Sequence, residues 1–253
     1  MSKHIFSIFL ENLTELTSNL NINQTFELKD KLVYSRITNI LRLSESDNII
    51  FFDKNINILV ELLSQTFKNN KSVFLKVLEK NKNKKLEPEI ILCTGLIKKS
   101  SFEELIYNAS ALGATIIQPI LTDKCQQKWA GQKEIDRLKK IIIAACEQSK
   151  NYCLPELYEP IKISEYLKYA KDKNYKKIFF ESDQIKTTEL IKELTQNKSE
   201  KIVLFFGPEG GFSDSEISNF QENNFVGYSL TKTILRSQEA VTVGLGLIRI
   251  VTK

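Results

Sequence analysis

The sequence has few of the residues that proteins use to bind metal ions. It contains four cysteines and one histidine among 253 residues. No two cysteines form a C-x-x-C pair, and His4, the only histidine, is not spaced to complete a zinc site. We therefore expect no bound metal. Neither His4 nor the single Trp129 lies in a cluster that indicates acid/base chemistry or base stacking.

Long apolar runs are also missing. The first apolar run, residues 5–10, is short and interrupted by Ser7, so it fails as the core of a secretory signal. No later stretch is long enough to span a bilayer. Cys93 and Cys146 stand among apolar residues, which is typical of reduced, buried thiols. Together these features predict a soluble, cytoplasmic protein with no membrane partner.

The sequence has no strong excess of either charge. The 36 Lys and Arg residues against 31 Asp and Glu give a net charge of +5, which fits an RNA partner and equally fits many soluble enzymes. The 42% apolar content and the mean hydropathy of -0.22 are typical of a globular protein rather than a disordered one. The length favours two domains, of roughly 70 and roughly 170 residues.

The N-terminal part, residues 1–75, is predicted to be a small β-barrel. Between residues 26 and 77, short apolar or alternating runs are separated by polar clusters, a pattern that predicts several short strands. The lysine-rich segment 79–88 follows and is predicted to be the linker. We found no internal repeat and no other low-complexity segment.

The C-terminal part, residues 76–253, shows strands alternating with helices. Apolar runs at 90–94, 114–121, 178–180 and 202–206 predict buried strands, and amphipathic stretches between them predict helices. One of these helices is predicted to start at a capping box formed by Ser101 and Glu104. Such alternation predicts an α/β fold with a parallel sheet covered on both faces.

A glycine-rich segment follows the strand at 202–206. It runs Gly-Pro-Glu-Gly-Gly-Phe over 207–212, and Ser213 with Glu216 forms a capping box that fixes the start of the next helix. Ligands of open α/β sheets bind at the carboxyl ends of strands. The segment is neither a Walker A motif nor G-x-G-x-x-G, so phosphate binding is not favoured. A plain tight turn, with no ligand, is about as probable from this pattern alone.

A second segment joins a predicted strand at 226–230 to a predicted helix at 237–251. Ile234 and Leu235 are apolar residues in this connection, and they either wall a ligand pocket or pack beneath the loop, which is the commoner fate. Arg236 directly precedes the helix, where a cation opposes the positive end of the helix dipole. Arg236 therefore needs a compensating partner.

Four separate elements resemble the family of 16S ribosomal RNA uridine N3-methyltransferases. Gly-Pro-Glu-Gly-Gly-Phe-Ser is complete at 207–213, and Ser-Leu-Thr-Lys-Thr-Ile-Leu-Arg-Ser-Gln-Glu-Ala stands at 229–240. Upstream, 36–43 is similar to the family's Val-Leu-Arg-Leu segment, and 144–149 with Pro155 is similar to its Ala-x-Glu-Gln-Ser…Pro element. The resemblance covers about residues 30–253.

The resemblance implies a SPOUT methyltransferase domain with a C-terminal trefoil knot, preceded by a PUA-like barrel that binds RNA. It also implies S-adenosylmethionine as the cofactor, a homodimer, and 16S ribosomal RNA or the small ribosomal subunit as the partner. The residues that it carries over to the cofactor are Phe206, Gly207, Gly210, Gly211, Leu230, Ile234 and Leu235.

The implied reaction assigns further roles. Uridine N3 must lose a proton as it attacks the methyl group, so a cation that stabilises the developing anion lowers the barrier. We assign that role to Arg236. Glu209 is a second candidate catalytic residue, which either interacts with the positive charge of the sulfonium or holds the loop through a hydrogen bond, and the two roles are equally good. N3 lies on the Watson–Crick edge, so the base must be unpaired. Arg36 and Arg42 are candidate phosphate contacts, with an ordinary solvated charge as the commoner role for either one.

The chain also departs from the family pattern. Thr231 replaces a glycine, Gln238 displaces the expected Glu-Thr, Ala111 replaces a glutamate, and Asn151 stands where arginine is expected. A β-branched residue at a glycine position is expected to tighten or reshape the cofactor loop. Two alternatives stay open: another SPOUT specificity, such as ribose or transfer RNA methylation, and a ribosome-binding assembly protein with weakened catalysis.

Overall fold

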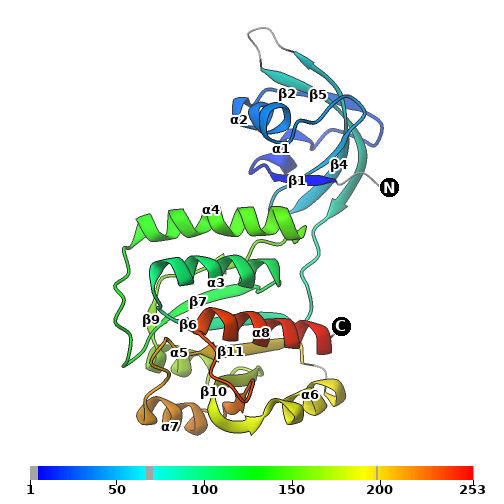
Figure 1. Cartoon of the computed structure of the whole chain (residues 1–253). Coiled ribbons are helices and arrows are strands. Elements are labelled where there is room, and N and C mark those ends of the chain that lie inside the picture. Colours follow the sequence, from blue (N-terminus) through cyan, green and yellow to red (C-terminus); the bar gives the residue numbers. More distant parts are fainter. Residues whose placement is uncertain (1–4, 67–70, 198, 253) are drawn as a thin grey trace. The chain divides into compact units, whose positions relative to one another are not determined.

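The computed structural model describes residues 5–66, 71–197 and 199–252, and His4 lies outside these ranges. The chain forms two compact units (Figure 1). The first comprises Met1–Lys84 with Lys150–Cys153, and the second comprises Lys85–Ser149 with Leu154–Lys253. None of the described helices is long and apolar enough to cross a membrane.

The first unit is built on a five-stranded mixed sheet. Its elements are β1 (Phe6–Phe9), α1 (Leu13–Leu16), β2 (Thr25–Leu28), α2 (Lys31–Ser35), the π-helical turn η1 (Arg36–Ile40), β3 (Asn48–Phe52), β4 (Ile56–Thr66) and β5 (Ser72–Lys82). The strand order is β1-β3-β4-β5-β2. The pair β1–β3 is parallel and the others are antiparallel. Alternate residues of β3, β4 and β5 bury one face of the sheet against α1, α2 and η1.

Two features of the first unit differ from the sequence prediction. Helical structure, not strand, occupies residues 31–40, because the Asp30 carboxylate accepts hydrogen bonds from the backbone N–H groups of Leu32 (2.8 Å) and Val33 (3.0 Å) and caps a helix there. Strand β5 also runs past the expected boundary at residue 75 and includes the first residues, 79–82, of the lysine-rich segment that was predicted to be a linker. Residues 79–82 pair with residues 56–59 of β4, and the compact first unit extends to Lys84.

The second unit is an α/β domain with an all-parallel sheet. Its elements are β6 (Glu89–Gly95), α3 (Lys99–Ala111), β7 (Ile116–Leu121), α4 (Gln132–Ser149), β8 (Glu156–Leu157), β9 (Ile161–Lys162), α5 (Ile163–Ala170), β10 (Lys176–Lys186), α6 (Thr187–Gln196), β11 (Lys201–Phe206), α7 (Asp214–Glu222), β12 (Val226–Ser229) and α8 (Ser237–Val251). The strand order is β12-β10-β11-β6-β7-β8, with β9 also paired to β7. The predicted α/β class and parallel sheet are confirmed.

Helices cover both faces of this sheet (Figure 1). Phe179 and Phe205 point from β10 and β11 toward α5 and α7 and form one core with Phe220. The next residue of each strand, Phe180 and Phe206, points to the other face, where α8 packs beside α3 and α6. Because successive side chains of a strand point to opposite faces of the sheet, these phenylalanines contribute to one apolar layer on each face. The trefoil knot stays a prediction of the resemblance.

The predicted strands at 90–94, 114–121, 178–180 and 202–206 are confirmed as β6, β7, β10 and β11. The capping box at Ser101 is wrong, because α3 begins two residues earlier, at Lys99, and has no side-chain cap. Helix α5 was not predicted, although its buried residues recur at helical spacing.

Arg249 joins the last turn of α8 to the end of α3. Its guanidinium donates hydrogen bonds to the backbone carbonyls of Pro88 (2.8 Å), Leu112 (3.2 Å) and Gly113. Desolvation lowers the pKa of Arg249 to about 10, which leaves it charged at neutral pH. The guanidinium thus satisfies carbonyls left without partners where α3 ends.

Replacing Arg249 with methionine is expected to destabilise the second unit by about 2 kcal/mol, because three carbonyls lose a charged donor while the apolar stem is kept. Thermal unfolding followed by circular dichroism would show a melting temperature lower by several degrees. Arg249→Lys keeps the positive charge but loses the planar guanidinium with its several donors. Its melting temperature should lie between those of wild type and the methionine variant. Unchanged melting in the methionine variant would show that these hydrogen bonds contribute nothing to stability.

Candidate functional site

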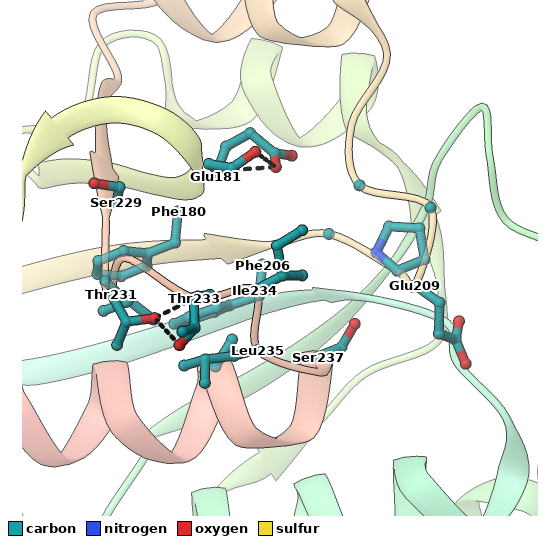
Figure 2. A pocket seen from close by; sticks show the side chains of 17 residues that line it. Phe180, Glu181, Phe206, Glu209, Ser229, Thr231, Thr233, Ile234, Leu235 and Ser237 are labelled. Atoms are coloured by element: carbon teal, nitrogen blue, oxygen red, sulfur yellow. Dashed lines mark hydrogen bonds between the residues drawn. The ribbon is translucent and has the colours of Figure 1, made fainter.

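A cavity of about 280 Å³ opens at the carboxyl ends of β11 and β12 and beside the middle of β10, the strand between them. Its walls come from residues 180–182, from 206–211 and from most of 229–235, with Ser237 and Ala240 of α8 (Figure 2). The two segments identified in the sequence therefore face each other across one cavity. All seven residues expected at the cofactor line it.

Two stacked aromatic rings give the cavity an apolar wall. The ring centroids of Phe180 and Phe206 lie 4.8 Å apart, with an interplanar angle of 22°. Gly244 of α8 packs directly against them, since a Cβ atom there would lie 2.6 Å from Cζ of Phe206. The close approach of α8 holds the two rings in place beneath the cavity.

The glycine-rich turn at 207–212 is folded tightly on itself. The Gly211 N–H donates to the Pro208 carbonyl at 2.9 Å, and Gly211 has a φ of 66°, a conformation that favours glycine. A Cβ at Gly207 would lie 3.1 Å from Cα of Gly211, and one at Gly95 would lie 2.6 Å from the nitrogen of Pro208. Gly207 is required because the two ends of the turn lie in contact, and Gly95 is required because β6 lies in contact with Pro208.

The predicted start of α7 is confirmed. The Glu216 N–H donates to Oγ of Ser213 at 3.2 Å, and the Ser213 N–H donates to Oε2 of Glu216 at 2.9 Å. The loop after β7, which was not singled out from the sequence, supports the same turn. Asp123 accepts a hydrogen bond from Oγ of Ser213 at 2.6 Å, and Nζ of Lys124 donates to the Phe212 carbonyl at 2.8 Å.

The second turn accommodates threonine without backbone strain. Thr231 does not have a positive φ, and its hydroxyl donates to the Thr233 carbonyl at 2.5 Å. The expected reshaping by a β-branched residue is therefore limited to one local hydrogen bond. Leu235 and Ile234 both line the cavity, with Leu235 half-buried and Ile234 95% exposed at the rim.

The two residues expected to act in catalysis lie in different places. Glu209 lines the cavity, and its Oε1 accepts a hydrogen bond from the Lys98 N–H at 3.1 Å, as the loop-bonding alternative supposed. Arg236 is exposed and does not line the cavity, although its neighbours Leu235 and Ser237 do. The Arg236 N–H donates to Oε2 of Glu239 at 3.0 Å, which places a carboxylate at the start of α8.

One lining residue with a charged side chain was missed. Glu181, near the end of the β10 segment that pairs with β11, lies beside the glycine-rich turn (Figure 2). Sequence reasoning missed it because the apolar run at 178–180 marks the strand but not the residue after it. A carboxylate directly after a buried apolar run could have indicated that Glu181 belongs to the site.

The candidate phosphate contacts, Arg36 and Arg42, belong to the first unit. Arg36 starts the π-helical turn and is half-buried. Arg42 follows that turn, is exposed, and has a φ of 51°, an uncommon conformation for arginine.

The cavity suits a nucleoside that carries a positive charge. The rings of Phe180 and Phe206 with Leu230 and Leu235 offer an apolar surface for a base, while the glycines expose backbone groups. Among the residues that the structure describes, the ionisable side chains that line it are two carboxylates, Glu181 and Glu209. S-adenosylmethionine, an adenosine joined to a sulfonium with a net positive charge, fits this lining. Across residues 5–66, 71–197 and 199–252, no cluster of three or more metal-binding side chains occurs.

Comparison with known proteins agrees with this description. Residues 84–249 match the family model of an RNA methyltransferase domain. A ribosomal RNA small subunit methyltransferase E from Synechocystis is 31% identical over 83% of this chain and 68% of its own length. The enzyme of the same name from Rickettsia conorii is 29% identical over 94% of this chain and 95% of its own length.

Solved structures show the same fold. A ribosomal RNA small subunit methyltransferase E from Neisseria gonorrhoeae, bound to S-adenosylmethionine, superimposes with a TM-score of 0.79 at 25% identity and covers 98% of both chains. A protein from Legionella pneumophila, also solved with S-adenosylmethionine bound, gives a TM-score of 0.77 at 23% identity, again over 98% of both chains.

Proposed function

The chain belongs to the family of ribosomal RNA small subunit methyltransferase E enzymes, and from this premise we propose that it methylates N3 of a uridine in 16S ribosomal RNA. It is thus an S-adenosylmethionine-dependent methyltransferase. The observation that carries the proposal is the cavity that the two family motifs enclose at the ends of β11 and β12, the strands on either side of β10. The proposal includes a cytoplasmic location, because the proposed substrate is ribosomal RNA.

The cavity residues divide the task of binding between apolar and backbone groups. Phe206, Leu230 and Leu235 would hold the adenosine, with Ile234 at the rim, and the backbone of Gly207, Gly210 and Gly211 would approach the methionine part. The cofactor supplies an electrophilic methyl group on a positively charged sulfur. Because most of these contacts come from backbone or generic apolar groups, we expect the site to tolerate the change to Thr231.

Arg236 is the proposed catalytic cation. Its exposed side chain follows Leu235 at the rim of the cavity, which is where a base outside the cavity would approach. As N3 loses its proton, negative charge spreads to the uracil oxygens, and a guanidinium there lowers the energy of that anion. Glu209, held by the Lys98 N–H, orders the glycine-rich turn rather than taking the proton.

Recognition of the RNA would require the first unit as well. The target base must be unpaired, because N3 is otherwise engaged in base pairing. Arg36 and Arg42 would contact phosphates and so position the RNA without reading its sequence.

The proposal includes a homodimer. Helix α8 is apolar on its outer side as well as its buried side: Val243 is 44% and Ile250 is 75% exposed, and Gly246 and Leu247 lie between them at helical spacing. An apolar stripe on an exposed helix favours a protein partner. A second copy of this chain, with its own α8, would cover it.

The Ile250→Lys variant is expected to weaken dimerisation by at least roughly tenfold, because a charge would be buried against an apolar surface. Sedimentation velocity at micromolar concentration would show dimer for wild type and monomer for the variant. Ile22→Lys, at a position 57% exposed in the first unit, should stay dimeric. A wild-type monomer would refute this part of the proposal.

The function is tested by incubating small ribosomal subunits that lack this methylation with the chain and labelled S-adenosylmethionine, then mapping the modified base by mass spectrometry. Methylation of a uridine at N3 is the expected result. A 2′-O-methyl ribose, or label in transfer RNA alone, would favour another SPOUT specificity. Failure to bind the cofactor at millimolar concentration would favour an assembly protein.

A further inference from the structure

The Glu181 carboxylate is an uncompensated negative charge in the wall of the cavity. Its Oε2 accepts a hydrogen bond from the Phe212 N–H at 3.1 Å, and its Oε1 accepts one from the Ser182 N–H at 2.9 Å. In the described part of the chain, no Lys or Arg forms an ion pair with it, and Lys124 is engaged by the Phe212 carbonyl. Neutral N–H donors orient the carboxylate without cancelling its charge.

The position of Glu181 is fixed from two sides. A Cβ at Gly211 would lie 2.9 Å from Oε2 of Glu181, so the carboxylate packs directly on the glycine-rich turn. Its neighbour Phe180 belongs to the aromatic wall. The carboxylate therefore lies where the apolar part of the cavity meets the backbone of the turn, as Figure 2 shows.

The other lining carboxylate is placed differently. The side chain of Glu209 extends from the far end of the turn, away from the aromatic wall (Figure 2), and its Oε1 is held by the Lys98 N–H. Glu209 is exposed, whereas Glu181 is half-buried. An interaction with a bound cation is stronger where less water screens it, so Glu181 has the larger effect of the two.

We propose that Glu181 makes the cavity selective for the positively charged methyl donor over the uncharged product. The inference rests on the proposed function. S-adenosylmethionine carries a sulfonium, which becomes a neutral thioether in S-adenosylhomocysteine when the methyl group leaves, while the ammonium and carboxylate of the methionine part stay. The attraction of Glu181 to the sulfonium is lost at that moment, which favours exchange of product for fresh donor.

A charge-selective role differs from a purely structural one in what it predicts. If Glu181 only holds Phe212 in place, its loss would weaken donor and product equally. If its charge attracts the sulfonium, only ligands that carry that charge would be affected. Sinefungin, in which an amine on carbon replaces the methyl sulfonium, keeps the positive charge and cannot transfer a methyl group, so it separates charge from chemistry.

The test is calorimetric titration of the full chain with S-adenosylmethionine, sinefungin and S-adenosylhomocysteine. For Glu181→Gln, which keeps an oxygen acceptor for Phe212, we expect the dissociation constants of the two charged ligands to rise roughly tenfold. The constant for S-adenosylhomocysteine should change less than about twofold. Asp183→Asn removes the same charge two residues away, outside the cavity, and should leave all three unchanged.

The possible outcomes separate this inference from the function on which it rests. If wild type binds none of the three ligands, the proposed function fails. If wild type binds them and Glu181→Gln weakens all three equally, or none, charge selection by Glu181 is overturned while the function stands. Circular dichroism spectra that match wild type would establish that the variant is folded.

Discussion

The Arg236→Ala variant is expected to transfer methyl groups roughly 100-fold more slowly than wild type. Its affinity for S-adenosylmethionine should stay within about threefold, because the Arg236 side chain does not line the cavity. The reason for the slow rate is loss of the cation that stabilises the uracil anion as the proton leaves N3. Single-turnover methylation of small ribosomal subunits would measure the rate, and calorimetry would measure the affinity.

Two further variants make this result specific. Arg236→Lys keeps a cation and should recover part of the rate, while Lys232→Ala removes an exposed cation from the same turn that does not line the cavity. Lys232→Ala should therefore be close to wild type in rate. If Arg236→Ala is as fast as wild type at saturating RNA, the assignment of Arg236 as the catalytic cation is wrong.

The Gly211→Ala variant should bind S-adenosylmethionine at least roughly tenfold more weakly than wild type. Alanine at a φ of 66° is strained, and its Cβ would lie 2.9 Å from Oε2 of Glu181. The turn must shift to relieve both effects, and it forms one wall of the cavity. Calorimetric titration of the folded variant measures the change.

Gly131→Ala is the matched control for backbone strain. Gly131 has a φ of 65°, nearly that of Gly211, but nothing lies within 4 Å of the position of its Cβ. The substitution costs similar strain at a site outside the cavity, so cofactor affinity should be unchanged. Equal affinities for wild type and Gly211→Ala would mean that the glycine-rich turn does not contact the ligand.

Much of the second unit could be predicted because its signals are local. Apolar runs mark β6, β7, β10 and β11, and the Ser213–Glu216 capping box fixes the start of α7. In contrast, residues 31–40 lie in a stretch whose short apolar runs predicted strands, and the structure has helical turns there, which start at the cap formed by Asp30. In short segments without a long periodic pattern, single hydrogen bonds of this kind determine whether helix or strand forms.

The site was predictable only in part, for a physical reason. The family motifs place the two turns in sequence, and parallel strands bring their carboxyl ends to one edge, so the cavity follows from both. Glu181, Asp123 and Lys124 act through contacts with residues at least 30 positions away. A local sequence pattern cannot predict contacts between residues so far apart in the chain. The hydrogen bond from Arg249 to the Pro88 carbonyl was unpredictable for the same reason.

The most direct test of the account is a crystal structure of the full chain grown with S-adenosylmethionine. The adenosine is expected beside Phe206, Leu230 and Leu235, and the sulfonium near the Glu181 carboxylate. Electron density for the cofactor elsewhere on the chain, with this cavity empty at saturating ligand, would contradict it.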